Sequence, residues 1–444
     1  MEKRIRILFI AAVMTLCLAV LIATVVLPRA EPLANEVLKA PPTLVSGGQV
    51  NIGFFSELGD WLTTGFAFRH EAIDLSSRVK AGLFASSNTE SVILGKNGWL
   101  YYASTADDYM GIPAVTSRQA ANIAISLSLA QEYAEKNGAD FLVAVAPNKN
   151  TIVPENMPAR YRRNGSGGTL ELLYGALRRY GVAFVDLRET LTGEDYHRLD
   201  SHWNNRGAAK AGQAIMAALG RTGADCSGMG YGERADFPGD LYGMLYPLGR
   251  ERDLQQYYEL PGFEESGTPE DIRYETANPG GSGSLLMYRD SFGNALSPFL
   301  AAEFESARFS RSVVYDLTGA AKDGRDAVIL EIAQRNIRSL AGREIVIESP
   351  TRELPIPDTA REIGFTASAE QKNGLTAVTG SFDPAWCGEG ERIYALAGGT
   401  VYEAFPVDEA SFALYLPEGA SADSIRLILT SGGEWFITEE KSLS

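Results

Sequence analysis

Two stretches of the sequence carry residue types that together can perform nucleophilic catalysis. Asp200 lies two residues before His202, and the chain holds only three histidines. At this spacing in a loop, a carboxylate can turn back onto the imidazole, fix its tautomer and stabilise its protonated form. Ser291 follows a short apolar run and precedes a helical pattern, which places it on a strand-to-helix turn. Backbone N–H groups converge at such a turn and can receive an oxyanion, so Ser291 is a candidate nucleophile with His202 as its base.

Each stretch also has an explanation that involves no chemistry. Asp200 can cap the helix that the small residues at 207–219 predict, which leaves His202 as an exposed loop residue. Ser291 can likewise cap the helix that starts at its own turn. The order of the residues along the chain does not decide between the two explanations, because a triad is defined by geometry.

The two other histidines fit a catalytic role less well. His197 has a carboxylate at the same spacing, Asp195, but lacks the tryptophan and the helix that follow His202. His70 has no carboxylate at that spacing and falls within a helical pattern. We therefore expect both to be structural, while Trp203 is expected to form one wall of the site.

A wider pattern surrounds these residues. Asp-x-His-Trp at 200–203 is followed by Gly-Ala at 207–208, and a later strand ends in Asp-Ser at 290–291. The combination resembles the SGNH-hydrolase-like alginate O-acetyltransferase (DHHW) family. The resemblance covers about residues 50–340, because three upstream stretches occur in the order such proteins show, at 66–71, 95–101 and 146–149.

Two positions depart from the family pattern. Ser201 stands where the name-giving motif has its first histidine, and Arg289 stands where better-known members of the superfamily carry glycine. The first departure leaves the Asp200–His202 pair intact, whereas the second alters the turn that carries Ser291. The serine also comes last here and first in the usual SGNH order, so the resemblance implies a circularly permuted order of motifs.

The resemblance implies an O-acetyltransferase that modifies a cell-surface or secreted polysaccharide through an acetyl-serine at Ser291. An integral-membrane acyltransferase would supply the acetyl group, and neither a cofactor nor a metal is expected. Asn148 resembles the oxyanion asparagine of the SGNH superfamily by its position after a strand. Lys149 is a further substrate-site candidate, since ligands gather at the carboxyl ends of parallel strands. Two other functions stay open: a secreted carbohydrate acetylesterase and a non-catalytic polysaccharide-binding scaffold.

Alternating strand and helix patterns must position these residues. Such alternation predicts an α/β fold with a doubly wound, mainly parallel sheet that is covered on both faces. Residues 221–283 are rich in Gly, Pro and charge, and we interpret them as a long loop that shapes the site. The predicted strands are 141–146, 182–187, 284–288, 313–317 and 327–332, and the predicted helices are 54–84, 117–137, 170–180, 207–219 and the segment after Ser291.

Changes in composition divide the chain. An uncharged apolar run of about 20 residues follows three basic residues, which predicts a transmembrane anchor with its N-terminus inside. A cleaved signal peptide is the alternative, although its apolar core is usually only about 7–15 residues long. Past residue 343, short strand-like segments replace the long helices. The expected parts are a cytoplasmic tail (1–6), a transmembrane anchor (7–27), a linker (28–52), an SGNH-like catalytic domain (53–343) and a small β-rich C-terminal domain (344–444).

Charge and cysteine content exclude some classes of function. The formal net charge of −16 argues against non-specific binding of nucleic acid. Cys17 lies in the apolar run, and Cys226 and Cys387 fall in different predicted domains, so we expect two unpaired thiols outside the anchor. No cysteine or histidine spacing predicts a zinc site.

Overall fold

The chain is described here from a computed structural model. Cys17 and Cys387 form no disulfide, whereas Cys226 lies outside the described residues. The structure describes residues 2–27, 29, 31–32, 38–46, 48–165, 167–223, 228–357, 360–420 and 423–443.

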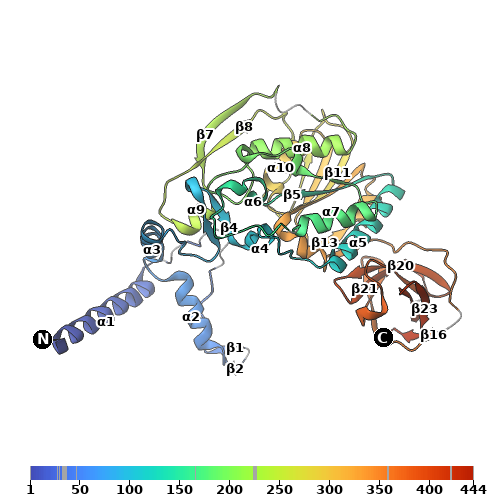
Figure 1. Cartoon of the computed structure of the whole chain (residues 1–444), viewed down its shortest axis with the longest axis horizontal. Helices are drawn as coiled ribbons and strands as arrows, with labels where there is room; N and C mark the ends of the chain where they lie inside the picture. The colour runs from blue at the N-terminus through green and yellow to red at the C-terminus, as the bar shows by residue number, and fades with distance from the viewer. Residues whose placement is uncertain are drawn as a thin grey trace.

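A seven-stranded sheet forms the centre of the molecule (Figure 1), with the strand order β6–β5–β14–β11–β12–β10–β9. The first five strands run parallel to one another, and β10 and β9 add antiparallel pairings at one edge. Because the carboxyl ends of parallel strands share one edge, the segments that follow them meet there. The strands are β5 (Asp140–Ala146), β6 (Phe184–Val185), β9 (Glu264–Glu265), β10 (Arg273–Ala277), β11 (Ser284–Tyr288), β12 (Ser306–Ser310) and β14 (Ala327–Ala333).

Helices cover both faces of this sheet. Successive residues of β5 alternate between two apolar cores: Val143 packs in the core with α5 and α7, and Leu142 in the core with α8 and α10. The predicted α/β fold with a doubly wound sheet is confirmed. The helices are α5 (Ser117–Lys136), α7 (Thr169–Arg179), α8 (Asn205–Ala218) and α10 (Gly293–Ala301).

The N-terminal segment lies at one end of the molecule (Figure 1). It contains α1 (Glu2–Val26), a hairpin of β1 (Val45–Ser46) and β2 (Gln49–Val50), then α2 (Phe54–Gly65) and α3 (Arg69–Phe84). In the described part of the chain, α1 is the one helix whose length and mean hydropathy of 2.8 suit a membrane span. The prediction of one helix over 54–84 is wrong, because Phe68 takes a left-handed conformation with φ of 62°.

Short elements line the carboxyl edge of the sheet or connect the long helices. Strands β3 and β4 pair in antiparallel fashion across a tight turn. The elements are β3 (Val92–Leu94), η1 (Lys96–Gly98), β4 (Leu100–Tyr102), η2 (Ala103–Thr105), α4 (Ala106–Tyr109), α6 (Lys149–Ile152), η3 (Pro154–Asn156), η4 (Leu187–Glu189), η5 (Gly193–Asp195), α11 (Thr318–Lys322) and η7 (Gln334–Leu340).

The segment 221–283 is not the irregular loop that its composition predicts. It forms an antiparallel pair, β7 (Tyr231–Phe237) with β8 (Asp253–Tyr258), which encloses the short helix α9 (Asp240–Leu245), and it ends in β9 and β10. Most of β7 is exposed, so polar residues occupy both of its faces and no apolar alternation reveals it.

The C-terminal part is β-rich, as predicted. Nine strands join in one sheet, and Figure 1 shows it beside α5 at the end of the molecule opposite α1. Its elements are β16 (Ala360–Arg361), β17 (Phe365–Lys372), β18 (Leu375–Phe382), η8 (Pro384–Trp386), β19 (Ile393–Ala397), β20 (Thr400–Val407), β21 (Ser411–Leu416), β22 (Ser424–Ser431), β23 (Glu434–Thr438) and β24 (Lys441–Ser442).

The two sheets share a core. The predicted strand at 313–317 does not enter the central sheet; it forms β13 (Val314–Asp316), which pairs with β15 (Glu344–Val346). The residues of β15 therefore pack with the α/β part although they follow residue 343. Phe405 and Tyr415 of the C-terminal sheet are buried in the same apolar cluster as α5. We propose that the boundary between the two parts falls after β15.

Candidate active site

The turn that carries Ser291 is held by the side chain of the residue before it. β11 ends at Tyr288, and Asp290 Oδ1 accepts a hydrogen bond from the Phe292 N–H at 3.0 Å. Asp290 Oδ2 accepts from the Ala333 N–H at 2.7 Å and from Asn336 Nδ2 at 2.8 Å. These bonds join the end of β11 to the end of β14, so the start of α10 is fixed relative to the sheet.

Arg289, where the resemblance implies glycine, anchors the same turn. Its guanidinium is buried and donates to the Pro269 carbonyl at 2.6 Å and to Asn294 Oδ1 at 2.5 Å. A Cβ at Gly293 would lie 2.5 Å from Arg289 Cδ, so the larger side chain at 289 requires glycine at the first position of α10.

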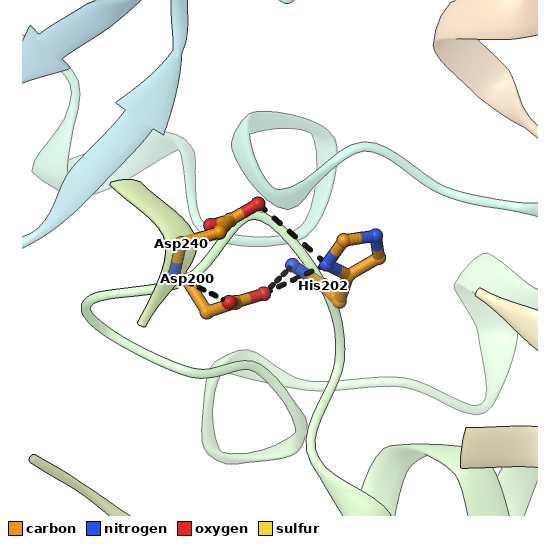
Figure 2. Close-up of side chains that lie close together, drawn as sticks. All are labelled: Asp200, His202 and Asp240. Atoms are coloured by element: carbon orange, nitrogen blue, oxygen red, sulfur yellow. Dashed lines mark hydrogen bonds and ion pairs between the residues drawn. The ribbon is translucent and has the colours of Figure 1, made fainter. Parts of the chain in front are cut away.

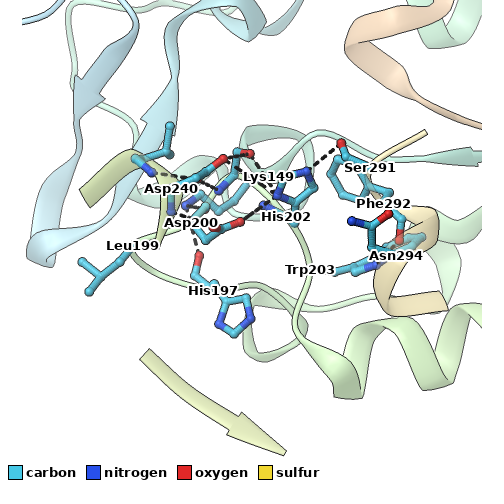
Figure 3. Close-up of polar contacts among 12 residues, drawn as sticks. Lys149, His197, Leu199, Asp200, His202, Trp203, Asp240, Ser291, Phe292 and Asn294 are labelled. Atoms are coloured by element: carbon cyan, nitrogen blue, oxygen red, sulfur yellow. Dashed lines mark hydrogen bonds and ion pairs between the residues drawn. The ribbon is translucent and has the colours of Figure 1, made fainter. Parts of the chain in front are cut away.

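Three predicted residues meet in one hydrogen-bonded row (Figure 3). The ring of His202 lies 2.8 Å from Asp200 Oδ1 through Nδ1 and 2.9 Å from Ser291 Oγ through Nε2. The His202 backbone N–H also donates to Asp200 Oδ1 at 2.9 Å, which is the turn-back geometry that the spacing predicts. Asp200 is 4% exposed; burial disfavours its charge, but the hydrogen bond and charge of His202 hold its pKa well below the usual range.

Trp203 lies behind this row instead of forming an open wall of the site. It is 1% exposed, and its indole Nε1 donates to the Phe292 carbonyl at 3.1 Å, which links the histidine loop to the serine turn. The next residue, Asn204, caps α8 by accepting from the Gly207 N–H at 3.0 Å. Gly207 is required there, since a Cβ would lie 2.4 Å from the Asp195 carbonyl oxygen.

A second carboxyl group belongs to the site and was not predicted (Figure 2). Asp240 Oδ2 lies 3.9 Å from His202 Nδ1 and accepts from Ser201 Oγ at 2.7 Å, and that hydroxyl is itself 3.2 Å from Nδ1. The Asp240 N–H donates to Asp200 Oδ2 at 2.7 Å. Burial and the charge of Asp200 raise the pKa of Asp240 to about 6. One sequence signal marks this position: Gly239-Asp240-Leu241 resembles a GDSL block, although it lacks the serine.

Asp200, His202 and Asp240 also form the one group of potential metal-ligating side chains with suitable spacing that the described residues contain. Their donor atoms lie within 4.8 Å of one another. Every carboxylate oxygen already accepts a hydrogen bond from an N–H or O–H donor. Both Asp200 oxygens accept from backbone N–H groups, Asp240 Oδ1 accepts from the Ser201 and Leu241 N–H groups, and Asp240 Oδ2 accepts from Ser201 Oγ. We assign no metal to the cluster, because its hydrogen bonds account for every oxygen.

The two candidates after β5 differ in what they touch. Lys149 is buried, and its Nζ donates to the carbonyls of His197 at 3.0 Å and Asp200 at 2.5 Å, so it supports the histidine loop from beneath. Burial lowers the pKa of Lys149 to about 8. Asn148 is 1% exposed, and its side-chain amide has no hydrogen-bond partner among the described residues.

The two remaining histidines lie in structural surroundings. His197 stacks on Phe237 with ring centroids 3.9 Å apart, and burial lowers its pKa to about 4, so the ring is neutral near pH 7. His70 Nε2 lies 3.0 Å from the Glu31 carbonyl, in the N-terminal segment. Neither ring contacts Ser291.

Arg335 is a further site residue that sequence reasoning did not assign. Its Nη2 lies 3.4 Å from His202 Nε2, and its guanidinium packs over the rings of Phe292 and Tyr102 at 5.0 and 5.6 Å. No described carboxylate pairs with it. The only signal was its position two residues after β14 at the carboxyl edge of the sheet. A fixed positive charge beside the Ser291–His202 contact is suited to receive negative charge there.

Comparison with known proteins finds similarity to a described family over part of the chain. Residues 92–272 match the family model described as SGNH hydrolase-like domain, acetyltransferase AlgX. A protein named "Probable alginate O-acetylase AlgJ" from Pseudomonas syringae pv. tomato is 26% identical over 133 residues, which is 29% of this chain and 33% of that protein. The chain therefore spans about a third of the length of this curated relative.

Three solved structures are similar to part of the chain. A DHHW family protein from Eubacterium siraeum has a TM-score of 0.41 at 16% identity, covering 58% of this chain and 99% of that one. Bacillus cereus PatB1 with a sulfonyl adduct has a TM-score of 0.44 at 14% identity, covering 56% of this chain and 97% of that one. The O-acetyltransferase domain of Pseudomonas putida AlgJ has a TM-score of 0.38 at 19% identity, covering 56% of this chain and 92% of that one. From the family model and the AlgJ relative, the predicted resemblance is confirmed: residues 92–272 are similar to the SGNH hydrolase-like domain of acetyltransferase AlgX.

Proposed function

We propose that this chain is a membrane-anchored, extracytoplasmic O-acetyltransferase that acetylates a cell-surface or secreted polysaccharide through an acetyl-serine at Ser291. The observation that carries the proposal is the row Asp200–His202–Ser291, with contacts of 2.8 and 2.9 Å. This row has the connectivity that activates a serine hydroxyl: a carboxylate orients the imidazole, and the imidazole accepts the hydroxyl proton.

The first half-reaction forms the acetyl-enzyme. Ser291 Oγ attacks the acetyl carbonyl carbon, its proton moves to His202 Nε2, and the carbonyl oxygen becomes an oxyanion. The Ser291 N–H at the start of α10, the Arg335 guanidinium and the amide of Asn148 are the candidate groups to stabilise it. When the carbonyl re-forms, the bond to the donor oxygen breaks, and His202 returns the proton to that leaving oxygen. The products are acetyl-Ser291 and the deacetylated donor.

The second half-reaction transfers the acetyl group from Ser291 to the acceptor. An acceptor sugar hydroxyl gives its proton to Nε2 and attacks the acetyl carbon, and the bond to Ser291 Oγ then breaks with return of the proton to that oxygen. Two carboxylates, Asp200 and Asp240, lie on the Nδ1 side of the ring, so together they stabilise the imidazolium that forms in both steps. They also offset the unfavourable effect of Arg335 on that positive charge.

The N-terminal helix and the family similarity support membrane attachment and a membrane partner. α1 has Lys3, Arg4 and Arg6 before its apolar run, which predicts an inside N-terminus and an outside catalytic part. An acetyl donor outside the cytoplasm requires transport of the acyl group, so an integral-membrane acyltransferase is the expected supplier.

Acetylesterase activity is the second candidate, because water can replace the sugar hydroxyl at the same acetyl-serine. The test compares acetate release and acetyl transfer by the full chain from an activated acetyl ester, with and without acceptor oligosaccharides. Transfer predicts that a matching acceptor diverts acetyl groups from water to sugar, while an esterase releases acetate at the same rate either way. The Ser291→Ala chain should do neither, and His70→Ala serves as the active control.

A further inference from the structure

Exposed apolar side chains gather in one short segment outside α1. Of the large hydrophobic residues that are exposed in the described chain beyond residue 27, ten lie between 44 and 84 and nine in all the rest. Soluble proteins scatter such residues singly over their surfaces, and a dense group indicates a surface that another phase or molecule covers. We call residues 44–84 the membrane-proximal segment.

Two patches make up this segment. The first lies on the β1–β2 hairpin and the start of α2, where Ile52 is 98% and Phe55 82% exposed; its other members are Leu44, Val45 and Val50. The second is a stripe along α3, where Leu75, Val79 and Leu83 recur at every fourth residue and therefore share one helix face. Phe84, at the end of α3, extends that stripe and is 70% exposed.

Direct contacts join the end of α1 to α2 and to the turn before α3, the elements that carry the two patches. Thr24, in the last turn of α1, accepts a hydrogen bond from the Ala67 N–H between α2 and α3 at 2.9 Å. Arg29 donates to the Trp61 carbonyl at 2.7 Å and packs over the Trp61 ring at 5.0 Å. Figure 1 shows α2 and the hairpin leaving the end of α1 to one side, while the central sheet and the β-rich part extend away from it.

We propose that the membrane-proximal segment lies in the outer interface of the same bilayer that α1 spans, as a second contact between the protein and lipid. The proposal rests on the membrane anchor of the proposed function. Interfacial segments bury an apolar face to a depth of about 5–10 Å and keep charged groups in water. Glu57 and Asp60 supply such groups on α2, as do Arg78 and Lys80 on α3.

This contact would hold the active site at a fixed height above the membrane. Arg78 of α3 packs over the ring of Tyr246, directly after α9, at 5.5 Å. α9 begins with Asp240, the carboxyl group beside His202. A series of contacts therefore connects the segment to the histidine loop, which suits an enzyme whose acetyl donor arrives at the membrane surface.

Depth-dependent quenching tests the proposal on the full chain in vesicles of phosphatidylethanolamine and phosphatidylglycerol. Single cysteines replace Ile52, Phe55 or Leu83 in a background without Cys17, Cys226 and Cys387, and each carries an environment-sensitive fluorophore. Matched controls carry it at Ile272 and Val313, which are exposed to similar extents, 73% and 71%. We expect blue-shifted emission and quenching by nitroxide lipids at the three test positions, at depths of about 5–10 Å, and water-like emission at both controls.

Three outcomes separate the possibilities. Water-like probes at 52, 55 and 83 on chains that float with the vesicles would overturn the interfacial contact while leaving the anchor intact. Chains that fail to float would instead refute the anchor itself. Blue shifts that disappear when chains are diluted to one per vesicle would show that a second copy covers the surface, which also contradicts a lipid contact.

Discussion

Asp240→Asn removes one of the two carboxylate charges on the Nδ1 side of the imidazole and leaves that of Asp200 in place. Asn keeps an oxygen for the Ser201 and Leu241 N–H donors, and its amide N–H can donate to Ser201 Oγ, so the loop should stay folded. Asp240 Oδ2 lies 3.9 Å from His202 Nδ1, and two unit charges at about 4 Å interact by about 4 kcal/mol at an effective dielectric constant of about 20. Because His202 is partly open to solvent and three hydrogen bonds delocalise the carboxylate charge, we expect about half of this for the imidazolium of the transition state. A loss of about 2 kcal/mol corresponds to a fall in turnover of about 30-fold.

The pH dependence distinguishes this electrostatic effect from simple damage to the loop. Burial and the charge of Asp200 raise the pKa of Asp240 to about 6, so the carboxylate is mainly charged above that pH and neutral below it. The deficit of the Asn variant should therefore be full at pH 8 and should shrink as the pH falls below about 6, where the wild-type group is itself neutral.

The assay is the pH profile of kcat for both chains on an activated acetyl ester. Asp253→Asn is the matched control, because Asp253 is a buried carboxyl that accepts from the Leu199 N–H of the same loop at 2.6 Å. A deficit that is equal at pH 5 and pH 8, or equal in the control, would refute the reasoning and reduce Asp240 to a structural residue.

Three more predictions follow from the contacts of the site and the fold. Arg335→Met should lower kcat about 100-fold or more, as removal of one oxyanion donor does in other enzymes, with a smaller effect on KM; unchanged kcat in steady-state assays would exclude the guanidinium from the transition state. Lys149→Met leaves the His197 and Asp200 carbonyls unpaired in the interior, at a cost of about 1–3 kcal/mol each, so thermal unfolding should begin at lower temperature and activity should fall; a variant with wild-type Tm would contradict the supporting role. A chain that ends at residue 343 should unfold or aggregate, because it loses β15 and uncovers the core shared with Phe405 and Tyr415, and a cooperative melt of that chain at the wild-type Tm would show two independent cores.

Local patterns in the sequence were enough to predict the parts of the site that lie on the central sheet. The apolar run at 284–288 is β11 as predicted, and the parallel sheet follows from the alternation of strands and helices. The Asp200–His202 contact could be predicted because the two residues lie two positions apart in one loop. The contact of His202 with Ser291 could be predicted only from the resemblance, because the motifs at 200–203 and 290–291 both belong to it.

The residues that were missed act through contacts between distant segments. Asp240 is 38 residues from His202 in a segment without apolar periodicity, and Arg335 follows a strand at the same edge without any motif of its own. Lys149 was placed at the correct edge, but only the fold determines that its ammonium group turns toward loop carbonyls and not outward. Phe68 breaks a helix whose apolar pattern continues through the break, since periodicity does not report one left-handed residue.

Mass spectrometry of the acyl-enzyme tests the central claim most directly. The full chain is incubated with an activated acetyl ester, stopped in acid and digested, and the acetyl group is located along the sequence. Acetyl-Ser291 should appear in the wild type, should be absent from Ser291→Ala, and should form orders of magnitude more slowly in His202→Ala, because members of a triad act as a unit. An acetyl group on another residue, or unchanged turnover in Ser291→Ala, would contradict the acetyl-serine mechanism and favour the non-catalytic scaffold.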